Sequence, residues 1–143
     1  MRALLDVNVW IALFDSDHAF AARCNAWVER ERPAIATCPM VENGVLRIMS
    51  GAGYSGRMKK SVADVALLLR EACAKNDHEF WPDEVSLRDA RIFDVTRLHG
   101  PRQITDAYLL ALAVAHGGRF VTLDSATPLS AVRGASKKHL FVL

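Results

Sequence analysis

Short apolar runs alternate along the chain with longer segments whose apolar residues recur at helical spacing. The runs are too short to be helices and are typical of strands that are buried on both faces of a sheet. The expected strands are residues 3–5, 34–37, 120–123 and 139–143, with a further candidate at 79–81. Strands that are separated by helices pair in parallel. The pattern therefore predicts an α/β protein, a three-layer α/β/α sandwich around a parallel sheet of four or five short strands.

The intervening segments carry apolar residues three and four positions apart, which is the spacing of an amphipathic helix. The expected helices cover about residues 7–14, 39–49, 61–72, 87–93 and 105–116, and a further one runs through residues 20–28 and is ended by Pro33. Side-chain oxygens at helix starts can accept hydrogen bonds from the free N–H groups of the first turn. On this basis the candidate caps are Ser16 or Asp17, Ser86 and Thr105.

Length and composition agree with one folded domain spanning residues 1–143. Hydrophobic residues make up 51% of the chain and charged residues 24%, which is typical of a soluble globular protein. The longest uncharged apolar run is about half the length that a membrane span needs, and Asp6 and Asn8 interrupt the first apolar stretch, so no secretory signal is expected. The three cysteines have no paired spacing. We therefore expect free thiols and a cytoplasmic protein.

Aspartates directly follow two of the expected strands. Asp6 ends the strand 3–5 and Asp124 ends the strand 120–123. Ligands of open parallel sheets bind at the carboxyl ends of the strands, so both acids are expected on that rim. Asp106 lies in the first turn of its helix, where the helix dipole favours an acid. Glu42 lies in an otherwise apolar helix.

Each of these acids also has a purely structural explanation, as a cap, a turn residue or a surface residue. As a set they are harder to explain in that way, because converging carboxylates raise one another's pKa unless a cation binds. Hard oxygen ligands suit Mg²⁺ or Mn²⁺. The chain has no histidine or cysteine pair at the spacing of a softer metal site.

Four segments of the chain resemble the acidic motifs of PIN-domain nucleases. They are residues 2–9, 39–47, 103–113 and 120–124, and each contains one of the four acids. Their order and spacing run the length of the chain. Together with residues 78–82 they look most like the VapC ribonuclease toxins of VapBC toxin–antitoxin pairs.

The resemblance implies that Asp6, Glu42 and Asp106 hold a divalent metal, Mg²⁺ with Mn²⁺ as a substitute. Asp124 would be a fourth acid that acts directly or through water. Asn8 and Thr105 match supporting polar positions of the family. The implied activity is endoribonucleolytic hydrolysis of RNA that leaves 5′-phosphate ends, with neutralisation by a VapB-type antitoxin. A homodimer is also implied, with Tyr54 and Met58 as candidate contacts.

Metal ions held by carboxylates lower the pKa of bound water and offset charge on a phosphate, so water is the expected nucleophile. Alternatives within the fold are a DNA nuclease and an RNA-processing nuclease that is not a toxin. Outside it, a phosphatase would need a second aspartate where Asn8 stands, and a phosphoacceptor receiver would need paired acids on the first strand. A non-catalytic binding module would keep four like charges together without a metal, which is costly.

The net charge of +2 is too small to indicate a nucleic-acid-binding protein by itself. Local clusters are more informative. Arg57, Lys59 and Lys60 follow a Gly-rich stretch, and Arg102 precedes Asp106 by four positions. If the fold places these cations beside the acids, they are candidates for RNA binding. Otherwise they are ordinary solvated surface.

Overall fold

A computed structural model describes residues 1–54 and 59–143 of the chain. Within these residues five strands form one sheet in the order β3-β2-β1-β4-β5, and every neighbouring pair is parallel. The strands are β1 (Ala3–Leu5), β2 (Ile35–Thr37), β3 (His78–Phe80), β4 (Arg119–Thr122) and β5 (Leu140–Val142). The expected parallel sheet of four or five strands is therefore confirmed.

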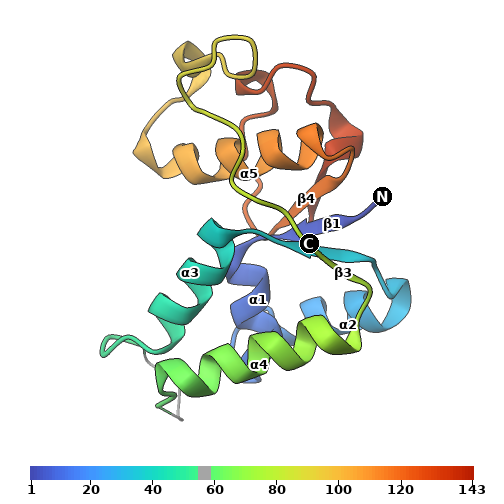
Figure 1. Cartoon of the computed structure of the whole chain (residues 1–143), viewed down its shortest axis with the longest axis vertical. Helices are drawn as coiled ribbons and strands as arrows, with labels where there is room; N and C mark the ends of the chain where they lie inside the picture. The colour runs from blue at the N-terminus through green and yellow to red at the C-terminus, as the bar shows by residue number, and fades with distance from the viewer. Residues whose placement is uncertain (55–58) are drawn as a thin grey trace.

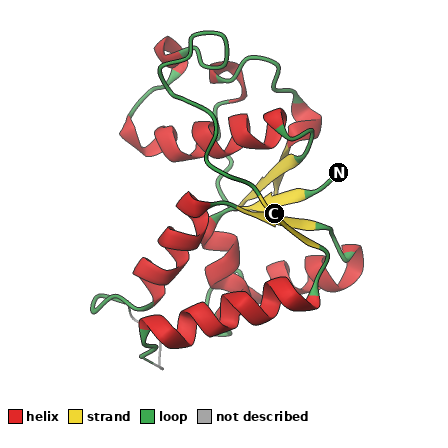
Figure 2. Cartoon of the chain, viewed as in Figure 1, coloured by secondary structure: helices red, strands yellow, loops and turns green. Residues whose placement is uncertain are grey.

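Helices cover both faces of the sheet, as Figures 1 and 2 show. The helices are α1 (Val7–Phe14), α2 (Ala21–Glu31), α3 (Pro39–Met49), α4 (Val62–Lys75) and α5 (Ile104–Ala115). Helices α1 to α4 lie on one side, and α5 lies on the other with four short 3₁₀ turns, η1 (Val95–Arg97), η2 (Pro101–Gln103), η3 (Leu129–Ala131) and η4 (Lys137–His139). This arrangement is the predicted three-layer sandwich. None of the helices in the described residues is both long and apolar enough to cross a membrane.

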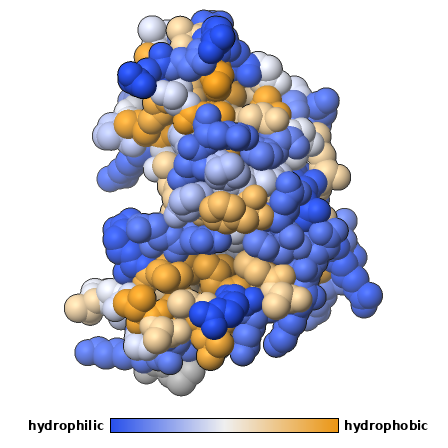
Figure 3. All heavy atoms as spheres, viewed as in Figure 1, coloured by the Kyte–Doolittle hydropathy of each residue, from blue (hydrophilic) through white to orange (hydrophobic). Residues whose placement is uncertain are grey.

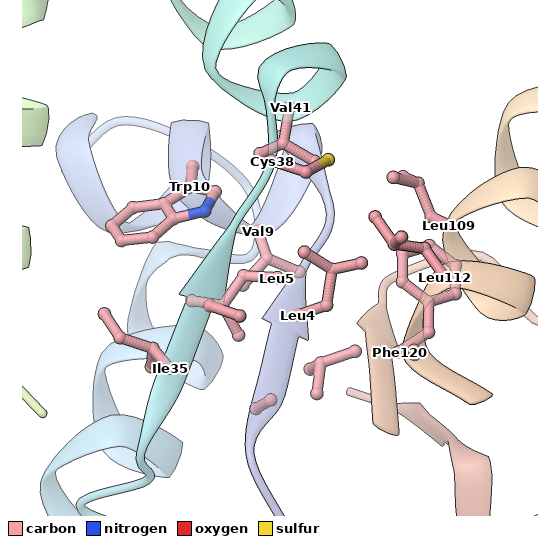
Figure 4. Close-up of a cluster of buried hydrophobic side chains, with 14 of the residues drawn as sticks. Leu4, Leu5, Val9, Trp10, Ile35, Cys38, Val41, Leu109, Leu112 and Phe120 are labelled. Carbon is pink, nitrogen blue, oxygen red and sulfur yellow. The ribbon is translucent and has the colours of Figure 1, made fainter. Parts of the chain in front are cut away.

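Alternation along the strands divides the core between the two helical layers. Successive strand residues point to opposite faces of a sheet. Leu4 pairs with Phe120 of β4, and Figure 4 shows both on the side of α5. Leu5 and Ile35 lie on the side of α1 (Figure 4). All four side chains are buried, so each strand supplies both layers of the core.

The order of the strands places a switch point between β1 and β4. From β1 the chain builds outward to β2 and β3, and it then returns to the other side of β1 to form β4 and β5. Crossover connections therefore leave the carboxyl ends of β1 and β4 in opposite directions. This is the position at which open parallel sheets bind their ligands.

Two expected helix caps were wrong. Helix α2 begins at Ala21 after Phe20, without a side-chain cap, so neither Ser16 nor Asp17 caps it. Side chains instead turn the preceding loop, where the N–H of Phe20 donates to Nδ1 of His18. Helix α5 begins at Ile104, so Thr105 lies within its first turn rather than before it.

The helix expected at residues 87–93 is also wrong, because this segment forms turns. Ser86 accepts a hydrogen bond from the N–H of Arg88, and Asp89 accepts one from the N–H of Arg91. Such local side-chain bonds compete with helical hydrogen bonding. Phe93 has the apolar spacing of a helix for a different reason. It is buried in an isolated antiparallel bridge with Val132.

Candidate functional site

Asp6 lies at the end of β1 and caps helix α1. Its Oδ1 accepts the N–H of Val7 at 2.7 Å, and its Oδ2 accepts the hydroxyl of Thr122 at 3.0 Å. The side chain is buried. Burial raises the pKa of Asp6, the bonds from Thr122 and Val7 act in the opposite direction, and the charge of Asp124 raises the pKa further. A buried carboxylate with two fixed oxygens is thus held at the switch point of the sheet.

Asp106 reaches the same region from the first turn of α5. Burial and the charges of Asp6 and Asp124 raise its pKa to about 6, against a weak hydrogen bond from Thr127. The hydroxyl of Thr127 lies 3.5 Å from Oδ2 of Asp106. Asp106 is therefore a carboxyl group whose charge is disfavoured by its neighbours, and a bound cation would relieve that repulsion.

Asp124 is the third aspartate whose charge acts in this region. It follows β4 and is exposed. Its N–H donates to Oγ1 of Thr122 at 3.1 Å, and its Oδ1 accepts the N–H of Ala126 at 2.8 Å. Thr122 therefore joins Asp6 to Asp124. Asp6, Asp106 and Asp124 share one electrostatic environment on the α5 side of the sheet edge.

Glu42 lies in the helical layer on the other side of the sheet from α5. It lies in the first turn of α3, and Gly44 of the same helix allows close packing, because a Cβ there would meet Val7 of α1 at 2.7 Å. Oε1 of Glu42 accepts the hydroxyl of Thr37 at 2.7 Å. Among the described residues, the carboxylate charges that shift the pKa values of Asp6 and Asp106 come from aspartates, not from Glu42.

The charge of Glu42 acts on a second group of side chains. Burial lowers the pKa of His78, and the charge of Glu42 opposes that shift. Burial raises the pKa of Cys73 to about 11, and Glu42 adds to that rise. The three aspartates are thus close enough for their charges to interact, whereas the charge of Glu42 acts on His78 and Cys73.

Of the remaining predicted residues, several that the structure describes lie at the surface. Asn8 and Thr105 are exposed in the first turns of α1 and α5, beside Asp6 and Asp106 in the sequence. Arg102 is exposed in η2, immediately before α5. Lys59 and Lys60 line a pocket of about 220 Å³ at the end of α3. Figure 3 shows a hollow in the surface between the α5 layer and the opposite layer of helices.

Two of the predicted residues, Arg57 and Met58, lie outside the described residues. Tyr54 is half-buried, and its hydroxyl donates a hydrogen bond to Asp15.

Sequence reasoning missed the threonines that hold the acids. Thr37 and Thr122 are the last residues of β2 and β4, and both are fully buried. The available signal was a polar residue at the end of a buried strand, because Asp6 and Asp124 were predicted from similar positions. Thr127 gave no such signal, because it lies in a loop.

A divalent cation fits the chemistry of these side chains. Carboxylate oxygens are the ligands that Mg²⁺ and Mn²⁺ prefer, and the pKa of Asp106 is raised first by burial and then by like charges, which a cation would offset. Among the residues that the structure describes, no three His, Cys, Asp or Glu side chains are already gathered as a metal-binding group. The chemistry of the donors, rather than a preformed cage, is what fits a metal.

Comparison with known proteins agrees with this fold. Residues 3–134 match the model of the PIN domain family, and the chain belongs to that family. Its relatives include Ribonuclease VapC44 of Mycobacterium tuberculosis (strain ATCC 25618 / H37Rv). The two sequences are 49% identical over 144 residues, and this match covers 100% of each chain. Ribonuclease VapC29 of the same strain is 36% identical over 87% of each chain. Ribonuclease VapC39 is 36% identical over 94% of this chain and 96% of its own.

Proposed function

We propose that the protein is a metal-dependent endoribonuclease, the VapC-type toxin of a toxin–antitoxin pair. The observation that carries the proposal is the cluster of Asp6, Asp106 and Asp124 at the switch point, in a chain that is 49% identical along its whole length to a relative named as a ribonuclease. These relatives are all named as ribonucleases, which supports RNA as the substrate.

The proposed metal ligands are Asp6, Glu42 and Asp106, with Asp124 acting directly or through water. When bound, Mg²⁺ or Mn²⁺ supplies a water of lowered pKa and offsets charge on the phosphate. The residues of the chain orient the carboxylates. Thr122 and the N–H of Val7 hold the two oxygens of Asp6, and Asn8 and Thr105 are proposed as supporting polar groups.

Cleavage of defined RNA and of DNA, with Mg²⁺, with Mn²⁺ and with a chelator, tests this function. The expected result is metal-dependent cleavage within RNA that leaves 5′-phosphate ends. Cleavage of DNA alone would instead support the alternative of a DNA nuclease of the same fold.

The proposed partner is a VapB-type antitoxin that covers the acidic site, and the proposed compartment is the cytoplasm. A homodimer is the proposed assembly, for which light scattering at micromolar concentration is a direct measurement. Tyr54 remains a candidate contact, although its hydroxyl is already engaged by Asp15 within the chain.

Replacing Lys59 and Lys60 by Ala is expected to weaken RNA binding and to reduce its dependence on salt. Each cation that contacts a phosphate releases counterions, so losing both should lower the magnitude of the logarithmic salt slope by about 1–2. Arg102→Ala, beside the third acid, should change the slope by about half as much. Binding of labelled RNA by a catalytically inactive variant, measured across a salt series, checks this.

The matched control is replacement of Lys137 and Lys138 by Ala. Both are exposed in η4, next to the edge strand β5, and the change in net charge is the same. An equal loss of RNA affinity in the two double variants would show that net charge, and not the position of Lys59 and Lys60, governs binding.

A further inference from the structure

The geometry points to Thr37 and His78 as positioning residues that hold the carboxylate of Glu42 for the metal. The inference rests on the proposed function. It assigns roles to two residues outside the four acids and follows from a hydrogen-bonded chain that runs from His78 through Thr37 to Glu42.

Adjacent strands place the two residues together. Thr37 is the last residue of β2, and His78 is the first of β3. Ile35 pairs with His78 and Thr37 with Phe80, so all four side chains share one face of the parallel sheet. That face carries helices α1 to α4 (Figure 1). The imidazole therefore reaches along the sheet to the hydroxyl at the end of the neighbouring strand.

The number of available protons sets the direction of these hydrogen bonds. An ionised carboxylate only accepts hydrogen bonds, so the single proton of the Thr37 hydroxyl is donated to Oε1 of Glu42, at 2.7 Å. The hydroxyl oxygen can then accept from Nε2 of His78, which lies 2.8 Å away. This series of hydrogen bonds thus requires the His78 tautomer that carries its proton on Nε2. In that arrangement Thr37 uses both its donor and an acceptor position.

Glu42 has room for other rotamers if the bond from Thr37 is lost. Its side chain lines a pocket of about 310 Å³ between α3 and α4, together with Leu46, Ala66, Leu69, Arg70, Cys73 and His78. Glutamate has several rotamers of similar energy. The bond from Thr37 restricts them while engaging only Oε1. Within the described residues no protein group donates to Oε2, which is left for another ligand.

The ordinary alternative is that the bond only satisfies a buried hydroxyl. Thr37 is 0% exposed in an apolar strand, where valine has the same shape and no polar group to satisfy. The two explanations differ in what they predict for metal binding. Partners that hydrogen-bond to metal ligands typically change metal affinity by about 10–100-fold when they are removed, whereas a local structural bond changes stability only.

The test is Mn²⁺ binding to the full-length protein, measured by electron paramagnetic resonance of the free ion. Thr37→Val should fold and bind Mn²⁺ about 10–100-fold more weakly. Thr37→Ser keeps the hydroxyl and should recover most of the affinity. Thr96→Val is the control, because it removes a hydroxyl that donates to Asp94, which is not one of the four proposed ligands, and it should leave the affinity unchanged.

Variants of His78 test the second link. His78→Gln can present an N–H close to the position of Nε2, so it should bind Mn²⁺ more tightly than His78→Leu. In the background of Glu42→Gln, Thr37→Val should have little further effect, because residues that act through one another are not additive.

The outcomes separate this inference from the proposed function. If the wild-type protein binds Mn²⁺ and Thr37→Val binds it equally well, Thr37 is structural and the positioning role is overturned. If Thr37→Val and Thr37→Ser lose affinity equally, packing rather than the hydroxyl is responsible, which also overturns it. If the wild-type protein binds no Mn²⁺, the proposed metal site itself fails, and the positioning role fails with it.

Discussion

Asp6→Asn is expected to reduce RNA cleavage by more than about 100-fold while the protein stays folded. Even the outer hydrogen-bonding partners of metal ligands alter activity by about 10–100-fold, so loss of a buried carboxylate ligand should cost more. The proposed role of Asp6 depends on its negative charge, which asparagine lacks. Cleavage of labelled RNA and thermal melting of the same preparation measure the two effects.

The fold should tolerate this change because asparagine can replace both hydrogen bonds of Asp6. Asparagine is as good a helix N-cap as aspartate, so its carbonyl oxygen can accept the N–H of Val7. Its amide group can donate to the hydroxyl oxygen of Thr122, which reverses the direction of the bond that Thr122 makes to Asp6 in the wild-type protein. The substitution also removes a charge whose burial raises the pKa of Asp6. We therefore expect an unchanged or slightly higher melting temperature.

Asp6→Ala separates stability from catalysis. It loses the cap, which costs about 0.5–2 kcal/mol, and leaves the hydroxyl of Thr122 without its acceptor. Its melting temperature should fall where that of Asp6→Asn does not, although both should be inactive. Full cleavage activity in folded Asp6→Asn would remove Asp6 from the catalytic site.

Saturating Mn²⁺ or Mg²⁺ should raise the melting temperature of the wild-type protein by roughly 5–10 °C. A ligand that binds only the native state at about 100 times its dissociation constant adds about 2.7 kcal/mol. One kcal/mol corresponds to roughly 2–4 °C in a chain of this size. Relief of the repulsion among Asp6, Asp106 and Asp124 is part of this gain. Differential scanning fluorimetry across a metal titration measures the shift.

Asp106→Asn tests whether the metal that causes this shift binds at the aspartates. The pKa of Asp106 is raised to about 6 in the folded protein, so its ionised form opposes folding at neutral pH. Replacing it by an amide should raise the melting temperature without metal and remove most of the metal-dependent rise. An equal metal shift in Asp106→Asn and in the wild type would place the metal elsewhere.

Local patterns in the sequence were sufficient to locate much of the candidate site. Asp6 and Asp124 each follow a short apolar run, and the carboxyl ends of parallel strands share one edge of the sheet. The helical spacing of α3 and α5 likewise placed Glu42 and Asp106 near helix starts. These inferences succeed because strand alternation and helical periodicity involve residues only a few positions apart.

Where local signals competed, the sequence was misleading. Ser86 precedes apolar residues at helical spacing, but its oxygen turns the chain instead of capping a helix. Phe93 pairs instead with Val132, which is far away in the sequence. Helical spacing in a short segment does not distinguish burial against a residue far away in the sequence from burial along a helix face.

The sequence alone thus determined the class of fold, the strand ends that carry acids and the type of metal those acids would suit. Only the tertiary structure decided how the acids are grouped and held. Thr122 lies 116 positions from Asp6, and His78 lies 41 positions from Thr37, yet each pair forms a hydrogen bond. Those contacts depend on which strands become neighbours and in what register. Strand order and register are set by burial of the whole sheet between two layers of helices, and no local pattern encodes them.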